Sequence, residues 1–491
     1  MKLLSRKAIA IIVMLLVLTL VLAACRDRED VDPDLTANGG EQTEGTTSAP
    51  PSGGDNNALP PPDGVHHPVD MGGRTLLAAS SWGNPMPFYN LNDDEPDPAV
   101  TENYLIERLI WDNGLRAKQQ FNFDVDYVHV VEDFIGVFTA SVMAGSPIAD
   151  LFFLEGGDLL SSIIGDLIMP WSVVDLPGSD IFGPGIYGRV STHLFGEDWG
   201  VYYNSPNPHV WMMGVNLDLI HAVGAPNPVD LYNNGQWTWD AALNIMRMAT
   251  RDTTGDGLFD QWGIAGQPVD IVRHFMAAND APFVDDNFNY AFDHPASIET
   301  LEFMEIIFRE GLWQYDPVLG FNPGDWGRNF FAAHEGNAAL FPSILWGMNG
   351  GDLPFEFAVV PFPVGPSNTA DYTWLGGFGG GLSLPFGSTW TPEDKLIIIE
   401  EFLAWPGDEV ELISEGGLNW PRSVLLTEED VQRWWVNGAR PRLDVGTLVP
   451  EYYWVLGDFV GAMYDQSMTV LQMVEYHRQP RQEMLDHFFA R

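Results

Sequence analysis

The sequence predicts an α/β protein built from two lobes. Strand-like and helix-like stretches alternate along its first folded part, which is typical of a parallel sheet covered by helices. About 420 residues follow a polar leading region, and one hydrophobic core rarely holds so many. Hydrophobic residues make up 45% of the chain and include 29 Phe and 18 Trp, so two cores have ample material.

Three strands and two helices are predicted in the first folded part. Residues 74–80 and 149–155 have the continuous apolar pattern of buried strands, and residues 123–130 alternate apolar with polar side chains. Residues 101–120 carry apolar side chains at helical spacing, and residues 134–146 are also expected to be helical. This order predicts one parallel α/β layer.

The amino terminus has the features of an export signal. Lys2, Arg6 and Lys7 precede an apolar run of about 15 residues, which is short for a membrane span. The run ends in Leu-Ala-Ala-Cys, which resembles the lipobox of bacterial lipoproteins, where the thiol is acylated, for example with palmitate. We expect residues 1–24 to be removed and lipid on Cys25 to anchor the chain at the outer face of the cell membrane. Ordinary secretion with a free thiol is the alternative.

Composition excludes several classes of protein. Cys25 is the only cysteine, so no intramolecular disulfide, cysteine nucleophile or cysteine metal site is possible in the body. A net charge of −45 argues against a nucleic-acid partner. Residues 25–72 are rich in Pro, Gly, Ser, Thr and Asp and predict a disordered tether, with a root-mean-square span of roughly 40 Å.

Six later segments carry a family resemblance. They are "ADLFFLEGG", "WGVYYNSPNPHVWMMGVNLDLIHAVGAPNPVDLY", "GQWTWDAALNIMRMATRDTTGDGLFDQWGIAG", "FFAAHEGNAALFPSILWGM", "FAVVPFPVGP" and "GGFGGGLSLPFGSTWTPEDKLIIIEEFLAW". In kind and order they resemble the extracellular solute-binding proteins of carbohydrate ABC transporters, the group that includes maltose-binding protein. The resemblance implies a two-lobed periplasmic-binding-protein-like fold of type II, with a cleft between lobes joined by crossover strands. It places one lobe at 73–210 plus about 377–425, and the other at 211–376 plus about 430–491.

Local physics supports two of these segments. Thr238 is a candidate N-cap, and Asp240 lies in the first turn of the following helix, where a negative charge is favourable. Five glycines within residues 376–383 allow large backbone rotations, as a hinge or a cleft-lining strand requires. The alternative for that stretch is an ordinary Gly-rich loop.

The segment "RDTTGDGLFDQWG" predicts a structural calcium loop. Oxygen donors occur in the order of an EF-hand at Asp252, Thr254, Asp256, the Leu258 carbonyl, Asp260 and Gln261. Thr254 replaces the usual Asp or Asn, and Gly263 stands where a bidentate Glu belongs. The alternative is a metal-free loop of Asx turns.

A sugar site combines flat aromatic platforms with charged or amide side chains. Most of the tryptophans are expected in the core, so the candidate ligand contacts rest on where the resemblance places cleft-facing turns. These candidates are Trp82, Glu155, Tyr203, Trp346, Trp374, Trp420, Arg422 and Trp454. Trp239 and Asp240 are interpreted as helix-start structure instead.

The predicted function is binding rather than catalysis. The chain has no His-Glu-x-x-His or Gly-x-Ser-x-Gly motif, and 68 acidic residues make any carboxylate pair uninformative without geometry. The resemblance implies a monomeric receptor that captures a carbohydrate, an oligosaccharide in our interpretation, and delivers it to an ABC permease with a cytoplasmic ATPase. A peptide or polyol ligand, a secreted carbohydrate-active hydrolase, and a non-transport surface or sensory lipoprotein are the alternatives. No cofactor is required, and the calcium ion considered above would have a structural role.

Overall fold

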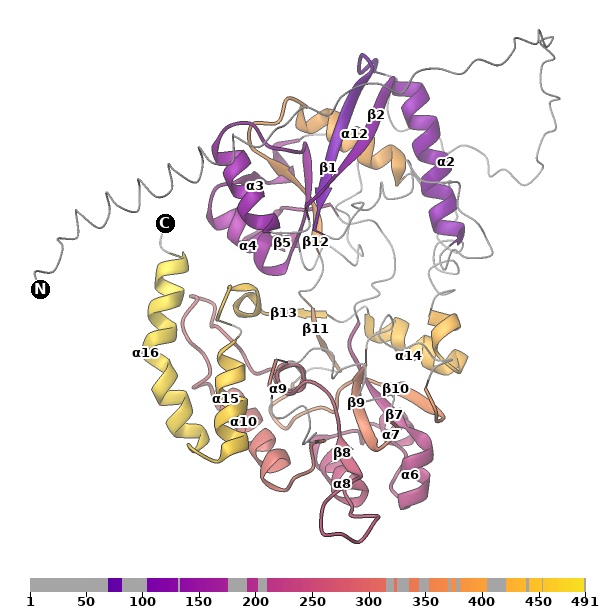
Figure 1. Cartoon of the computed structure of the whole chain (residues 1–491), viewed down its shortest axis with the longest axis vertical. Helices are drawn as coiled ribbons and strands as arrows, with labels where there is room; N and C mark the ends of the chain where they lie inside the picture. The colour runs from indigo at the N-terminus through magenta and orange to yellow at the C-terminus, as the bar shows by residue number, and fades with distance from the viewer. Residues whose placement is uncertain are drawn as a thin grey trace, which may run out of the picture. The chain divides into compact units, whose positions relative to one another are not determined.

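The structure is a computed structural model, shown in Figure 1. It describes residues 69–81, 104–130, 133–174, 192–201, 210–314, 322–324, 335–343, 353–369, 372–376, 380–403, 421–438, 441–452 and 454–489. The predicted signal segment, Cys25 and nearly all of the predicted tether lie outside these residues.

The first sheet has the strand order β2-β1-β3-β12-β4. Its strands are β2 (Phe123–His129), β1 (Arg74–Ser80), β3 (Leu151–Glu155), β12 (Gly380–Pro385) and β4 (Ile168–Met169). Strand β1 pairs in parallel with β2 and β3, so the predicted parallel layer is confirmed. Strand β12 returns from far along the chain and pairs antiparallel with β3 and β4.

Helices α2 (Tyr104–Phe121), α3 (Phe134–Met143), α4 (Gly156–Ile164) and α12 (Pro392–Phe402) accompany this sheet. The two helices predicted in this region are therefore confirmed as α2 and α3. Helices α2 and α12 are joined where the Asn113 side-chain amide donates to the Phe402 carbonyl at 3.2 Å.

Lys395 of α12 is fully buried, with 0% of its surface exposed. Its ammonium group has no hydrogen-bond partner among the described residues. Burial lowers the pKa of Lys395 to about 8, and the nearby charge of Asp150 opposes that change.

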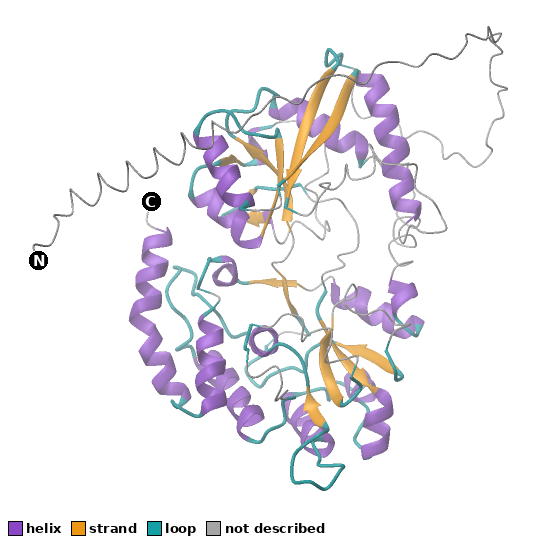
Figure 2. Ribbon diagram, in the orientation of Figure 1, coloured by secondary structure: helices purple, strands orange, loops and turns teal. Residues whose placement is uncertain are grey.

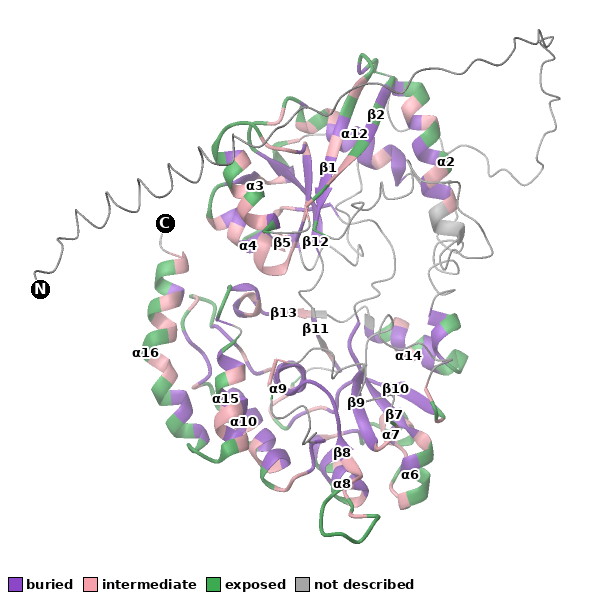
Figure 3. Ribbon diagram, viewed as in Figure 1, coloured by how far each residue is buried: buried purple, intermediate pink, exposed green. Residues whose placement is uncertain are grey.

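The second sheet has the order β10-β7-β9-β8. Its strands are β10 (Phe357–Val360), β7 (Met212–Asn216), β9 (Ala338–Ser343) and β8 (Trp262–Ile264). Strand β7 is antiparallel to both of its neighbours, and β8 runs parallel to β9. Every residue of β7 and β10 is buried, as Figure 3 shows, because helices or loops cover both faces of these strands.

Capping residues in the sequence fix the starts of several helices around this sheet. The helices are α6 (Leu217–Val223), α7 (Pro228–Asn233), α8 (Trp239–Ala249), α9 (Pro268–Ala277) and α10 (Pro295–Arg309). The Thr238 hydroxyl accepts a hydrogen bond from the Ala241 amide, so the predicted N-cap of α8 is confirmed. Asn216 and Asn227 cap α6 and α7 in the same way.

The remaining described elements are short strands, two 3-10 helices and the carboxyl-terminal α-helices; Figure 2 shows the helices and strands of the fold. They are η1 (Trp171–Val173), β5 (His193–Leu194), β6 (Glu197–Asp198), β11 (Trp374–Gly376), α14 (Glu428–Gly438), β13 (Pro441–Leu443), η3 (Val445–Leu448), α15 (Val455–Asp465) and α16 (Val470–Phe489). Strand β11 lies a few residues before β12 of the first sheet and pairs in parallel with β13.

The glycine-rich stretch becomes part of β12, where two backbones approach closely. A Cβ atom at Gly381 would lie 2.7 Å from the carbonyl carbon of Gly200, and one at Gly200 would lie 2.9 Å from the Gly381 Cα. A Cβ atom at Gly380 would lie 2.4 Å from the Leu154 carbonyl oxygen. These glycines therefore serve close packing of the sheet, and residues 377–379 of the stretch lie outside the described residues.

Candidate functional site

Glu155 lies at the carboxyl end of the buried strand β3. Its backbone pairs with Gly380 of β12, and helix α4 begins at the next residue. Glu155 occupies the N-cap position in an extended conformation, and its side chain makes no capping hydrogen bond. The carboxyl group is therefore not used to start the helix.

Burial controls the charge of this carboxyl group. It raises the pKa of Glu155 to about 8, and the negative charge of Asp158 contributes in the same direction. Burial also raises the pKa of Asp158 above its ordinary value. At neutral pH Glu155 is mostly protonated, so it presents one O–H donor and a carbonyl acceptor.

The first turn of α4 contacts the segment that leads into α15. A Cβ atom at Gly157 would lie 3.0 Å from the Leu448 carbonyl oxygen, at the end of η3. Six residues later Trp454 occupies the N-cap position of α15, with 52% of its surface exposed. One short segment therefore connects the neighbourhood of Glu155 with an exposed indole ring.

Trp454 also adjoins the start of α9. A Cβ atom at Gly324 would lie 3.0 Å from the Trp454 ring, so glycine leaves space for the indole there. The neighbouring Pro323 carbonyl accepts a hydrogen bond from the Val269 amide, in the first turn of α9, at 3.3 Å. Gln267, the N-cap residue of α9, is buried.

Helix α9 carries polar groups that sequence reasoning missed. All ten of its residues are buried, including Asp270 and Arg273, which form an ion pair at 2.8 Å. The Arg273 guanidinium lies 5.3 Å from the ring centre of Trp211. The sequence does show an acidic and a basic residue three positions apart in an apolar helix. That spacing is equally typical of an exposed helix face, so it did not indicate a buried ion pair.

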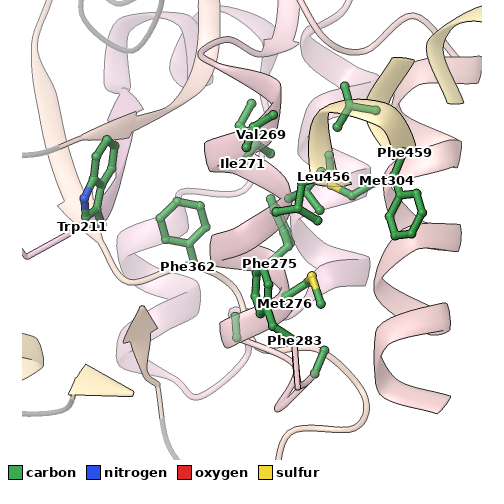
Figure 4. Close-up of a cluster of buried hydrophobic side chains, with 14 of the residues drawn as sticks. Trp211, Val269, Ile271, Phe275, Met276, Phe283, Met304, Phe362, Leu456 and Phe459 are labelled. Atoms are coloured by element: carbon green, nitrogen blue, oxygen red, sulfur yellow. The ribbon is translucent and has the colours of Figure 1, made fainter. Parts of the chain in front are cut away.

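His274 of the same helix lies between two aromatic rings. Its ring centre is 5.0 Å from that of Trp211 and 4.8 Å from that of Phe362. Figure 4 shows Trp211 and Phe362 beside the apolar residues of α9. Burial and the charge of Arg273 hold the pKa of His274 well below its ordinary value, so the imidazole is neutral at physiological pH.

Arg422, another predicted ligand contact, is engaged by a neighbouring carboxylate. Its Nε and Nη2 atoms donate to the two oxygens of Glu428 at 3.1 and 3.2 Å. This two-bond geometry orders the guanidinium at the start of α14. Its role in ligand binding stays a prediction.

Most of the other predicted contacts cannot be placed. Only the backbone of Trp374 is described, in β11, whereas the other four lie outside the described residues: Trp82, Tyr203, Trp346 and Trp420. The described candidates are therefore Glu155, Arg422 and Trp454, and the start of α9 adjoins Trp454.

The predicted calcium loop follows α8 and is exposed, as Figure 3 shows. Asp252 accepts hydrogen bonds from the amides of Gly255 and Gly257 at 2.6 and 2.7 Å. Asp260 accepts from the Thr253 amide and hydroxyl, and Asp256 accepts from the Leu258 amide. These bonds lower the pKa of both Asp252 and Asp260, so each is held as an anion.

Gln261, the last predicted calcium donor, is held at the edge of this loop. Its side-chain amide donates to the Ala249 carbonyl at 2.6 Å. No group of three or more His, Cys, Asp or Glu residues suited to a metal ion occurs in the described ranges. The calcium ion stays a prediction.

No helix within the described residues is both long and apolar enough to cross a membrane.

Solved structures, in contrast to sequence, give clear similarities. No protein-family model and no curated protein sequence matches the chain. An ABC substrate-binding protein from Listeria monocytogenes in complex with cycloalternan has a TM-score of 0.57 at 13% identity, covering 85% of this chain and 99% of that chain. The maltose/maltodextrin-binding domain MalE from Bdellovibrio bacteriovorus, bound to maltotriose, has a TM-score of 0.54 at 12% identity, covering 85% and 100%.

A third structure extends the chemical range of these proteins. The ABC transporter solute-binding protein from Agrobacterium radiobacter in complex with ribitol has a TM-score of 0.54 at 14% identity, covering 85% of this chain and all of that one. The chain thus has the two-lobed α/β fold of ABC solute-binding proteins, as the family resemblance predicted. At these identities the likeness establishes the fold.

Proposed function

We propose that this chain is a carbohydrate receptor of an ABC transporter. It binds an oligosaccharide, is anchored by lipid on Cys25, and delivers its ligand to a membrane permease driven by a cytoplasmic ATPase. The fold supports this proposal, since proteins that share it include binders of cycloalternan and maltotriose. The fold carries the proposal, and within it Gly157, two residues after Glu155, packs against Leu448, six residues before Trp454.

The chemistry of these two residues suits a sugar. An exposed indole ring stacks on the apolar C–H face of a pyranose, and a neutral carboxyl group both donates to and accepts from hydroxyls. Binding that contacts elements from both sheets shifts a population toward a closed conformation without any covalent step. The proposed activity is therefore reversible capture.

A polyol is the second candidate ligand. Ribitol is the ligand of one protein with the same fold, and its hydroxyls would use the same carboxyl group. A polyol has no flat ring face, so it would gain less from Trp454 than a pyranose would.

A melting-shift screen tests the receptor proposal. The purified mature protein is heated with maltotriose, cycloalternan, ribitol, single sugars and short peptides, and we expect the largest rise in Tm with an oligosaccharide. Trp454→Ala should lower the affinity for that oligosaccharide at least about tenfold, as measured by calorimetry. Trp390→Phe serves as the matched control, because Trp390 is buried beside β1, where its indole donates to the Thr75 carbonyl.

Two outcomes would contradict this proposal. A rise in Tm with peptides alone would show that the ligand is not a carbohydrate. Release of smaller sugars from the oligosaccharide by the purified protein would favour the hydrolase alternative.

A further inference from the structure

The backbone of Phe283 is held on both sides by the segment that precedes Trp454. Asp444 accepts a hydrogen bond from the Phe283 amide at 2.7 Å, and the Tyr452 hydroxyl donates to the Phe283 carbonyl at 2.7 Å. Phe283, Asp444 and Tyr452 are all buried. We call these two bonds the Phe283 clamp.

Charge and packing strengthen the clamp. Burial raises the pKa of Asp444 to about 6, while its bonds from the Phe283 and Gly446 amides act against that rise. Asp444 is therefore mostly ionised at neutral pH, and both bonds to it are charge-assisted. A Cβ atom at Gly446 would lie 2.7 Å from the Phe283 Cβ, so η3 packs directly on this residue.

The clamp fixes both ends of residues 444–452. Within that segment the Leu448 carbonyl meets the first turn of α4, two residues after Glu155. Two residues beyond it Trp454 is the N-cap residue of α15, where the Val455 amide donates to the Tyr452 carbonyl. The backbone of one residue, Phe283, therefore anchors a segment that contacts the first turn of α4 and leads into Trp454.

We propose that Asp444 and Tyr452 are positioning residues of the candidate binding site. By holding residues 444–452 on Phe283, they fix Trp454 relative to the amino-terminal turn of α4. The effect on ligand affinity rests on the proposed function, whereas the effect on the placement of Trp454 does not. Two separate measurements distinguish the effect on affinity from the effect on the placement of Trp454.

The first experiment uses the ligand-free protein. Tyr452→Phe removes one bond of the clamp, and Asp444→Asn weakens the other without changing the shape of the side chain. Acrylamide quenching of Trp454 is obtained as the difference between each protein and its Trp454→Phe counterpart. We expect each variant to raise the quenching constant of Trp454 by about twofold or more, and to speed amide exchange in the peptide containing Phe283.

Two control variants remove comparable bonds that do not involve the backbone of Phe283. Tyr290→Phe deletes a buried hydroxyl that donates to the Val474 carbonyl at 2.9 Å. Asp430→Asn changes a buried carboxylate that accepts from the Val359 amide at 2.9 Å. Both should lower Tm, as we also expect of the clamp variants, and leave Trp454 quenching unchanged.

The second experiment measures affinity for maltotriose by calorimetry, or for the oligosaccharide that most raises Tm. Tyr452→Phe should weaken binding about fivefold or more, and Tyr290→Phe should change it by less than about twofold. The double variant with Asp444→Asn should weaken binding by less than the product of the single effects, because both bonds hold the backbone of the same residue, Phe283.

The outcomes separate the two proposals. Equal Trp454 quenching in the Tyr452→Phe and Tyr290→Phe proteins would overturn the positioning role. If no saccharide binds the wild-type protein, the receptor proposal fails, and the quenching result alone decides whether the clamp places Trp454.

Discussion

At the scale of single residues, Glu155 shows how a fold changes the chemistry of a side chain. A free glutamate is an anion at neutral pH, but burial and the nearby Asp158 raise the pKa of this one to about 8. Within the described part of the chain, neither the Glu155 nor the Asp158 carboxyl group has a hydrogen bond or ion pair that would stabilise its charged form. A neutral carboxyl group suits an uncharged, hydroxyl-rich ligand better than an anionic one.

The raised pKa predicts how stability depends on pH. Because the folded state holds this proton more tightly than the unfolded state, Glu155 contributes stability that is complete below its ordinary pKa of 4.5 and is lost as pH rises through about 8. Glu155→Gln keeps the group neutral, so between about pH 6 and 9 its Tm should fall less than that of the wild-type protein, by about 2 °C or more. If the Tm of both proteins fell equally across that pH range, burial would not be the cause of the raised pKa of Glu155.

At the scale of elements, the loop after α8 is a segment whose sequence fits two structures. In its described conformation the carboxylates accept amide hydrogen bonds, which is the arrangement of Asx turns. A calcium ion would use the same carboxylate oxygens. The loop is exposed in the described conformation.

A calcium titration tests the metal at this loop. We propose that millimolar Ca²⁺ raises the Tm of the wild-type protein by a few degrees, about what a binding energy of 1–2 kcal/mol gives. Asp252→Asn should abolish the rise, whereas Asp230→Asn, on the separate helix α7, should retain it. An unchanged Tm in the wild-type protein would leave the loop as Asx turns without metal.

Elements with a clear pattern were predictable from sequence, and contacts between distant segments were not. The period of apolar residues predicted β1, α2, β2 and β3, and the side-chain chemistry of Thr238 predicted the start of α8. Periodicity cannot show that Gly200 meets Gly381, because their contact depends on how β12 returns to the first sheet.

The candidate site was predictable to the same extent. Glu155 and Trp454 were chosen because the family resemblance places cleft-facing turns there; the structure places them at the start of α4 and of α15, and their role in ligand binding stays a prediction. The pairing of Asp270 with Arg273 inside α9 was missed, since charged residues at helical spacing usually face water. The Phe283 clamp joins residues more than 150 positions apart, and sequence pattern carries no signal for it.

At the scale of the whole molecule, anchoring and ligand binding are proposed to be separate properties. Cys25 precedes a polar stretch that ends close to β1, and every residue of the described candidate site lies far beyond it in the chain. Removing the lipid should therefore leave the folded body intact.

Cys25→Ala tests this separation in the cell. The variant should appear in the medium or the soluble periplasmic fraction rather than the membrane fraction, and should bind the oligosaccharide with the affinity of the wild-type protein. Immunoblots of fractions and calorimetry provide the two measurements. Loss of binding in the soluble variant would show that anchor and site depend on each other.

The burial of Lys395 has a practical consequence. Apart from the lysines of the signal segment, the chain contains only this lysine and Lys118, whose ammonium is partly accessible and pairs with Asp124 at 2.5 Å. In the native protein an amine-reactive dye would therefore find one lysine, on α2, and would label it at a defined position. Lys395 would react only when α12 separates from the first sheet. The rate at which the dye appears on Lys395 would therefore measure how fast α12 separates from that sheet.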